Sequence, residues 1–266
     1  MQKLYTERDA KKTIDFVSDT HFECYNSIDF EKRVDEVFFN QCSDTLFIAG
    51  DFCQADRWTT LDLNRIFNKY KKVYYLFGNH EFYNSNIWLI SDHITKLQVN
   101  YPNVKFIPDN YHCTDLNTVF FTNWHTPQHT DLQRIADSRF IIDYNAHVKE
   151  MRSRDDAFIT ELLRQGVKPK YVVTHYLPFF ESISIKYMGS VLNKFFLSDR
   201  EDILHALEPK IVVHGHTHDT HHYIKSFENS DVTMAVWCNP IGYPNERQLY
   251  GAETGDYVRH FYNIGS

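Results

Sequence analysis

The chain has 266 residues, of which 42% are hydrophobic and 16% aromatic, and it carries a formal net charge of −7. This length and apolar content suit one large α/β domain, and we expect residues 1–266 to form a single domain. The acidic balance argues mildly against a protein that grips long duplex nucleic acid through its phosphates, but it leaves a local basic groove or a small phosphorylated substrate open.

The five cysteines are odd in number and include no C-x-x-C pair, which argues against a disulfide framework or a thiolate zinc site. The first residues are polar and contain no signal-like apolar region. No apolar stretch approaches the length of a membrane span. We therefore expect a cytoplasmic protein without a membrane partner, and the sequence leaves its oligomeric state open.

Short apolar runs alternate with helical patterns in the first hundred residues. We predict strands at 13–18, 44–49 and 73–77 and helices at 30–40, 58–70 and 84–98, the last capped by Asn84 or Ser85. This βαβαβ order predicts a largely parallel, buried sheet. In such sheets ligands bind outside the carboxyl ends of the strands.

The second half is less regular. The pattern predicts strands at 104–107, 119–124, 170–174 and 211–213, helices at 152–164 and from about 198 to 207, and late, antiparallel strands at 232–238 and 257–262. Residues 125–150 are interpreted as an excursion with one or two short helices, and residues 179–196 as a loop. We expect these two segments to choose the substrate.

Five polar clusters follow the predicted strands, one at each strand end. They are Asp19-Thr20-His21, Gly50-Asp51, Gly78-Asn79-His80-Glu81, Thr174-His175 and Gly215-His216-Thr217-His218. Side chains two residues apart in an extended segment point the same way, so the first and last clusters each offer a convergent pair. Asp51 is the candidate bridge, because two neighbouring cations need negative charge between them. Mixed oxygen and nitrogen ligands suit Mn²⁺, Fe, Zn²⁺, Co²⁺ or Ni²⁺.

In this order, the set D-x-H, G-D, G-N-H-[DE], H and G-H-x-H resembles the calcineurin-like metallophosphoesterase superfamily. Residues 185–190 and 239–244 further resemble small single-domain bacterial and bacteriophage members. The resemblance implies an α/β fold, a four-layer αββα sandwich of two mixed sheets flanked by helices. It also implies two divalent metal ions, Mn²⁺ first among them, and hydrolysis of phosphate esters by a metal-bridging hydroxide.

The resemblance carries residue roles with it. Asp19, His21, Asp51 and His218 would hold the first metal ion, and Asp51, Asn79, His175 and His216 the second. His80 would be the histidine that is no ligand and would steady the transition state or protonate the leaving oxygen. Glu81 stands where many members carry Asp, and we expect it to have a structural role or to orient His80.

The leading functional prediction is a phosphodiesterase acting on nucleotides or nucleic acid. A phosphomonoesterase or phosphoprotein phosphatase and a non-catalytic scaffold of the same fold are the alternatives. A scaffold typically lacks a ligand, and this chain keeps all of them. His214 is expected to be a satisfied core histidine rather than a ligand. His125 and His129, which follow a strand end, are candidates for a substrate contact.

Overall fold

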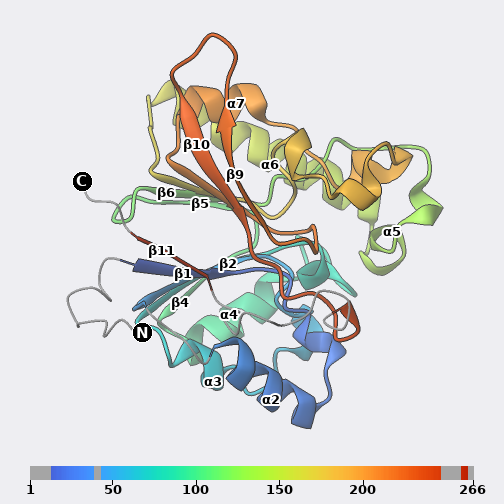
Figure 1. The fold of residues 1–266 in the computed structure, drawn as a ribbon. Helices are drawn as coiled ribbons and strands as arrows, with labels where there is room; N and C mark the ends of the chain where they lie inside the picture. The colour runs from blue at the N-terminus through green and yellow to red at the C-terminus, as the bar shows by residue number, and fades with distance from the viewer. Residues whose placement is uncertain (1–12, 39–42, 247–258, 263–266) are drawn as a thin grey trace.

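A computed structural model describes residues 13–38, 43–246 and 259–262 (Figure 1). The strands form two sheets. The first has the order β11-β1-β2-β3-β4 and the second the order β5-β6-β7-β8-β10-β9. The strands of the first sheet are β1 (Thr13–Val17), β2 (Thr45–Ala49), β3 (Lys72–Leu76), β4 (Val104–Ile107) and β11 (Arg259–Tyr262). Those of the second are β5 (Asn110–Cys113), β6 (Thr118–Phe121), β7 (Tyr171–Val173), β8 (Ile211–His214), β9 (His221–Ser226) and β10 (Thr233–Cys238).

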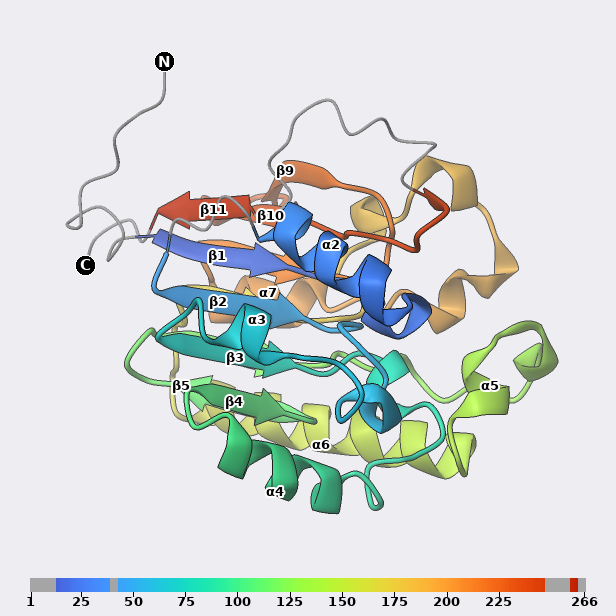
Figure 2. The same cartoon turned by 90° about the horizontal axis from the view of Figure 1, so that it is seen from below.

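Helices cover the outer face of each sheet. The α-helices are α2 (Ser27–Val37), α3 (Asn64–Phe67), α4 (Ser91–Asn100), α5 (Asp137–Phe140), α6 (Tyr144–Arg164) and α7 (Glu201–Leu207). Helices α2, α3 and α4 lie on the free face of the first sheet (Figure 2), and α6 and α7 lie on the second. Short 3-10 helices span Phe22–Cys24, Ala55–Arg57, His80–Phe82, Leu132–Arg134, Phe180–Ser182, Ile185–Tyr187 and Val191–Phe195. The expected sandwich of two mixed sheets flanked by helices is confirmed.

Both faces of the central strands are buried, as their continuous apolar runs predict. Alternate residues of one strand enter different cores: Phe47 packs between the two sheets, whereas Leu46 and Ile48 pack under the helices of the first sheet. Strands β1 to β4 pair in parallel, so their carboxyl ends lie at one edge of the sheet. Strands β6, β7 and β8 are also mutually parallel. No helix of the described residues is long and apolar enough to cross a membrane.

Two predicted helices of the first half are wrong in extent. In place of a helix over 58–70, the structure has a 3-10 turn at Ala55–Arg57 and one α-helical turn at Asn64–Phe67. In place of a helix from Asn84, a turn precedes α4, which begins only at Ser91. The side chain of Asn86 accepts hydrogen bonds from the backbone N–H groups of Trp88 and Leu89 at 3.0 Å. These local bonds compete with helical ones, which explains the late start.

The second sheet contains two strands that the periodicity did not indicate, β5 and β9. Both are half-buried strands paired antiparallel, β5 with β6 and β9 with β10. Strand β10 was expected to be antiparallel; it pairs antiparallel with β9 but parallel with β8. Helix α6 begins at Tyr144, eight residues before the predicted start at 152. The predicted excursion is thus shorter, and its helical content is one 3-10 turn and α5.

Candidate metal centre

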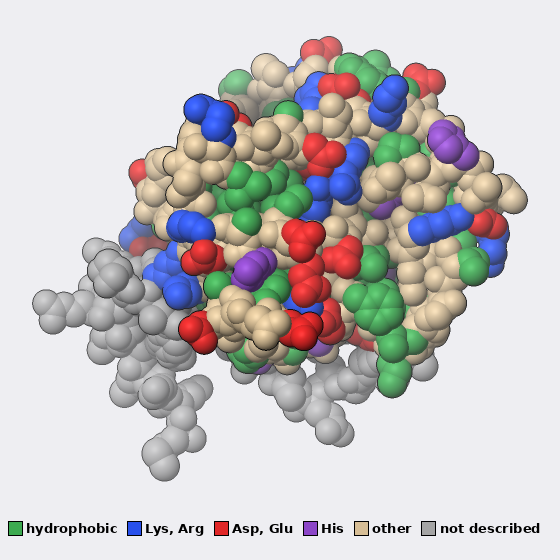
Figure 3. Space-filling view, turned by 90° about the horizontal axis from the view of Figure 1, so that it is seen from above, with side chains coloured by type: hydrophobic (Ala, Val, Ile, Leu, Met, Phe, Trp, Pro, Cys, Tyr) green, Lys and Arg blue, Asp and Glu red, His purple; other side chains and the backbone are tan. Residues whose placement is uncertain are grey.

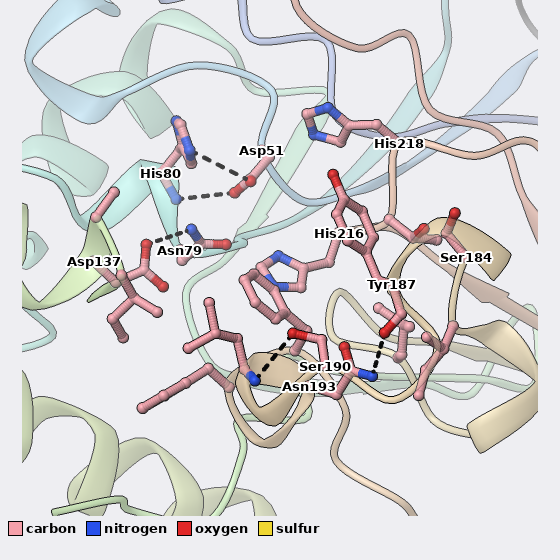
Figure 4. A pocket seen from close by; sticks show the side chains of 18 of the residues that line it. Asp51, Asn79, His80, Asp137, Ser184, Tyr187, Ser190, Asn193, His216 and His218 are labelled. Atoms are coloured by element: carbon pink, nitrogen blue, oxygen red, sulfur yellow. Dashed lines mark hydrogen bonds and ion pairs between the residues drawn. The ribbon is translucent and has the colours of Figure 1, made fainter. Parts of the chain in front are cut away.

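The five polar clusters meet where the carboxyl ends of both sheets face each other. Backbone hydrogen bonds join their turns: the N–H of Asp19 donates to the carbonyl of Gly50, and that of Gly215 donates to the carbonyl of His175. Asn79 and His80 lie on one side of Asp51, and His216 and His218 on the other (Figure 4). The structure therefore brings together all eight residues that the sequence singled out, from five separate strand ends.

One group of side chains consists of Asp19, His21 and His218, whose potential ligand atoms lie within 4.8 Å of one another. The Nε2 atoms of His21 and His218 are 3.1 Å apart. Carboxylate Oδ1 of Asp19 lies 3.9 Å from Nε2 of His218. This is the set expected for the first metal ion, apart from Asp51.

A second group consists of Asp51, His175 and His216. Nε2 of His175 lies 3.4 Å from Oδ1 of Asp51, 3.2 Å from Nδ1 of His216 and 3.0 Å from Oδ1 of Asn79. The other carboxylate oxygen of Asp51 lies 4.0 Å from Nε2 of His21, in the first group. Asp51 thus faces both groups, which is the position that a bridging carboxylate needs.

The residues present fit divalent cations. Nδ1 of His175, His21 and His218 faces the carbonyl of Ala49, the carboxylate of Glu23 and the carboxylate of Glu246, at 2.9, 3.2 and 2.6 Å. In a neutral imidazole, the ring nitrogen that donates its proton to such an oxygen leaves a free lone pair on the other ring nitrogen. In these three residues the nitrogen with the lone pair, Nε2, points into the centre. Facing lone pairs and buried carboxylates repel one another unless a cation lies between them. This donor set suits metal ions of the zinc and manganese type.

Burial and neighbouring charges shift the acid–base behaviour of the centre. Burial raises the pKa of Asp19. Burial also opposes ionisation of Asp51, but His175 and His80 outweigh it and hold the pKa of Asp51 well below its usual range. Burial lowers the pKa of His216, which favours the neutral, metal-binding form of its ring. Asp51 is therefore ionised in the centre, beside the neutral ring of His216.

His80 lies beside both groups and belongs to neither. Its backbone N–H donates to Oδ1 of Asp51 at 2.9 Å, and its Nδ1 lies 2.8 Å from Oε1 of Glu23. Its Nε2 lies 3.2 Å from the hydroxyl of Tyr243 and 3.9 Å from Oδ2 of Asp51. Burial lowers the pKa of His80, but Asp51 and Glu23 outweigh burial and raise it to about 9. The ring is thus held at a fixed angle by two partners.

Four residues of the centre were missed from the sequence. Glu23 binds both His21 and His80, Tyr243 contacts His80, and Glu246 binds His218. Asp137 accepts hydrogen bonds from the side chains of Asn79 and Tyr83, which turns Oδ1 of Asn79 toward His175. Only Glu23 carried a local signal, since it lies two residues after His21. The others come from distant segments whose periodicity says nothing of a site.

Glu81 has a structural role rather than a contact with His80. Its carboxylate is fully buried and accepts hydrogen bonds from the backbone N–H groups of Asp51, Phe52 and Gly78 and from the hydroxyl of Tyr75, at 2.7–3.1 Å. Burial, with a contribution from Asp51, raises its pKa to about 7. Glu81 thereby ties the turn after β2 to the turn after β3.

Positive φ falls on the candidate ligands themselves. Asp19, His21, Asp51 and His216 have φ of 51, 46, 53 and 68°. Non-glycine residues adopt this region only where the surrounding structure holds them there, and they concentrate at functional sites. Gly78, in the turn before Asn79, does not have positive φ. A Cβ there would collide with Oδ1 of Asp51 and Nε2 of His175, so glycine is needed for close approach.

A pocket of about 360 Å³ opens beside the centre. Its lining includes Asp51, His80 and His216 together with parts of both segments that we expected to choose the substrate, 134–137 and 183–196. The side chain of Tyr187 points into it (Figure 4). His125 is not part of this lining: its ring is buried and bonds to the hydroxyl of Tyr144 and the carbonyl of Thr126. The sequence also suggested His129, which does not line the pocket either.

Comparisons with known proteins show which family the sequence resembles. The sequence model of the family described as calcineurin-like phosphoesterase matches residues 12–220. A protein of Acanthamoeba polyphaga mimivirus, called uncharacterized protein L509, is 25% identical over 88% of this chain and 92% of its own length.

Two solved structures match the chain over most of its length. The phosphopantetheinyl hydrolase of Mycobacterium tuberculosis has a TM-score of 0.63 at 16% identity, over 95% of this chain and 96% of that chain. A dimetal phosphatase of Danio rerio has a TM-score of 0.47 at 13% identity, over 86% of this chain and 87% of that chain.

Proposed function

Since the chain belongs to the calcineurin-like phosphoesterase family and is a metal-dependent hydrolase of phosphate esters, we propose that it is a phosphodiesterase with a dinuclear metal centre. We propose small nucleotide-type diesters as its substrates. The observation that carries the proposal is the position of His80, which is held by Glu23 and Tyr243 beside two candidate ligand groups and lines the pocket.

The proposed ligands are Asp19, His21, Asp51, Asn79, His175, His216 and His218. When bound, divalent cations supply an activated water and neutralise charge on the phosphoryl oxygens. Asp51 faces both ligand groups and would supply negative charge to both ions. Mn²⁺ remains our first choice of metal, because the ligands mix hard oxygen with imidazole nitrogen.

His80 has the geometry to protonate the leaving oxygen. An alkoxide that leaves from a diester gains most from a proton, since it is a strong base. Glu23 on Nδ1 fixes the ring so that Nε2 faces the pocket side, where Tyr243 now contacts it. This pairing supports a diester substrate over a monoester with a good leaving group.

The pocket supports a small substrate. Its volume is that of an ordinary small-molecule site. Arg134 and Lys186 on its lining offer positive charge to a phosphate, and Tyr187 and Phe196 offer apolar surface to an organic group. On the face seen in Figure 3, acidic and basic side chains are interspersed, and no continuous basic stripe crosses it. A long duplex therefore has no matching surface on that face.

The test is a hydrolysis assay with Mn²⁺ on bis-p-nitrophenyl phosphate, p-nitrophenyl phosphate, nucleotides, cyclic nucleotides, single-stranded and duplex nucleic acids, phosphopeptides and a phosphopantetheinyl ester. The phosphopantetheinyl ester belongs in the panel because the protein of similar fold from Mycobacterium tuberculosis is named a phosphopantetheinyl hydrolase. We expect the highest kcat/KM on a small diester, and chelation should abolish the rate.

The Asp51→Asn variant is the control, because it removes the charge between the two ligand groups and should lose most metal and most activity. If phosphomonoesters or phosphopeptides are the best substrates, the diester proposal is wrong. Full metal occupancy in the variant would contradict the bridging role.

A further inference from the structure

A second cluster of metal-ligating side chains lies outside the phosphoesterase centre. It consists of His214 at the end of β8, His221 at the start of β9 and Cys238 at the end of β10. The sheet register pairs Cys238 with His214 on one side and with His221 on the other. The three residues thus form one row across three hydrogen-bonded strands, and directly paired residues present their side chains on the same face.

That face is the one covered by helices. Residues at alternate positions on the same strands, Val212 and Val236, pack in the core beneath α6 and α7, whereas Val213 packs between the two sheets. His214 and Cys238 are buried, and His221 is half-buried. The cluster is therefore enclosed by protein on most sides and reaches solvent at His221, which is how an ion could enter.

The ligand atoms are close enough to share one ion. Nε2 of His214 lies 2.9 Å from Nε2 of His221, and the Sγ of Cys238 lies within 4.8 Å of both. Nδ1 of His214 faces the carbonyl of Gly215 at 2.9 Å, so a donated proton there leaves a lone pair on Nε2. His221 is likewise hydrogen-bonded to the backbone of Asp219.

The same geometry marks the phosphoesterase centre. Histidine ring nitrogens approach within 3.2 Å at three places in the part of the chain that the structure describes. Two of these places are the ligand groups proposed for the dinuclear centre, and the third is this cluster. The cluster differs in chemistry, because it contains a thiol and no carboxylate.

We propose that His214, His221 and Cys238 bind a further metal ion of the zinc class, separate from the dinuclear centre. Two imidazoles and one thiolate suit Zn²⁺ or Co²⁺ and disfavour Mn²⁺ or Mg²⁺. Binding releases the thiol proton to solvent, since only the thiolate is a ligand. Three protein ligands leave a fourth tetrahedral position for water.

The ion would tie β9 to the turn that carries His216 and His218. That turn, residues 215–220, joins β8 to β9, and two of the three proposed ligands flank it. A metal bond across the turn would hold both of its phosphoesterase ligands in register. Cys238 adds the neighbouring strand, and its thiol makes a long contact of 3.6 Å to the carbonyl of Thr217.

Cobalt binding provides the test, because only a thiolate gives an intense sulfur-to-cobalt charge-transfer band in the near ultraviolet. The proposed dinuclear ligands contain no sulfur, so the band reports a cysteine ligand and is independent of enzymatic activity. Metal-stripped full-length protein titrated with Co²⁺ should develop the band. Zinc-loaded protein should hold one more Zn²⁺ per chain than its Cys238→Ser variant.

Two substitutions and their matched controls complete the design. Cys238→Ser should abolish the band, and His221→Gln should weaken it, with folding of each variant checked by circular dichroism. Cys24→Ser, at the exposed cysteine near His21, and His222→Gln, at the exposed neighbour of His221, should keep it. If the visible cobalt bands of the dinuclear centre appear without the sulfur band, His214 and His221 are simply hydrogen-bonded to each other, and the proposal is overturned. A band that survives in Cys238→Ser overturns it as well.

Discussion

At the scale of single residues, the arrangement of the metal centre depends on a few side chains that each contact two other groups. Asp51 faces both ligand groups, and Glu23 contacts both His21 and His80. The motifs named the proposed ligands but not Glu23, Asp137, Tyr243 or Glu246. A partner that orients a ligand can come from any segment that reaches it, so no fixed spacing reveals it.

The first prediction concerns His80. His80→Ala should keep its metal ions, because the side chain belongs to neither proposed ligand group, but kcat should fall by about 10²–10⁴-fold on diesters with alkoxide leaving groups. The loss should be smaller for p-nitrophenolate, which leaves without a proton. Steady-state kinetics on a series of leaving groups, with metal content measured alongside, checks this.

His93→Ala serves as the control for this substitution, since His93 is exposed on α4. Its kinetics should match those of the wild type. An equal loss in His80→Ala for good and poor leaving groups would mean that His80 acts by electrostatic stabilisation alone.

At the scale of elements, the turns after the strands are held to one another rather than folded independently. Glu81 accepts hydrogen bonds from backbone N–H groups of two turns. The backbone N–H of Asp19 donates a hydrogen bond to the turn after β2. The strands themselves were predictable, because apolar runs between polar turns have few alternatives. The helices at 58–70 and 84–98 were not, because side-chain bonds such as those of Asn86 override periodicity.

The second prediction belongs to these turns. Glu81→Gln places an amide donor against backbone N–H groups that need an acceptor, so we expect the free energy of unfolding to fall by about 2–4 kcal/mol. Because the turns carry Asp51 and Asn79, metal affinity should fall by about 10–100-fold. Urea denaturation and metal titration measure the two effects.

The matched control is Glu161→Gln on the surface of α6, where the carboxylate pairs with Arg164 and is half exposed. This variant should leave the unfolding free energy close to that of the wild type, because solvent screens an exposed ion pair. Wild-type stability in Glu81→Gln would show that the buried carboxylate does not hold the turns together.

At the scale of the whole molecule, two sheets and their helices bury histidines that belong to neither ligand group, among them His125 and His147. Burial lowers the pKa of His147 to about 3 and that of His125 to about 4. His147 accepts the backbone N–H of Ile87 and packs against Phe82 and Trp124. That the chain is a single domain and is located in the cytoplasm stays a prediction.

The third prediction is a pH dependence of stability. The folded-state pKa of His147 lies below its unfolded value of about 6.5, so its neutral form contributes stability above that pH and the contribution is lost as pH falls toward 3. The loss should reach about 1.4 kcal/mol per pH unit for this one group. His147→Gln keeps a hydrogen-bond acceptor but cannot titrate, so its stability should fall less steeply between pH 6.5 and 4.5.

Comparing the wild type with the variant separates the contribution of His147 from that of groups whose effect on stability has the opposite pH dependence. Burial raises the pKa of Asp155 to about 7, so that group favours the folded state as pH falls, equally in both proteins. Urea denaturation at several pH values gives the difference. Parallel curves for the two proteins would show that folding does not change the pKa of His147.

The sequence by itself determined the reaction class, the fold and the eight polar residues at strand ends, because parallel strands necessarily bring their carboxyl ends to one edge. Only the tertiary structure decided what surrounds them: Glu23 and Tyr243 on His80, the pocket built from 134–137 and 183–196, and the row of His214, His221 and Cys238. No C-x-x-C motif in the sequence indicated a metal site at this row of three residues, and His214 was expected to be a core residue. Side chains from different strands become neighbours through sheet register and packing, and those long-range contacts leave no periodic trace along the chain.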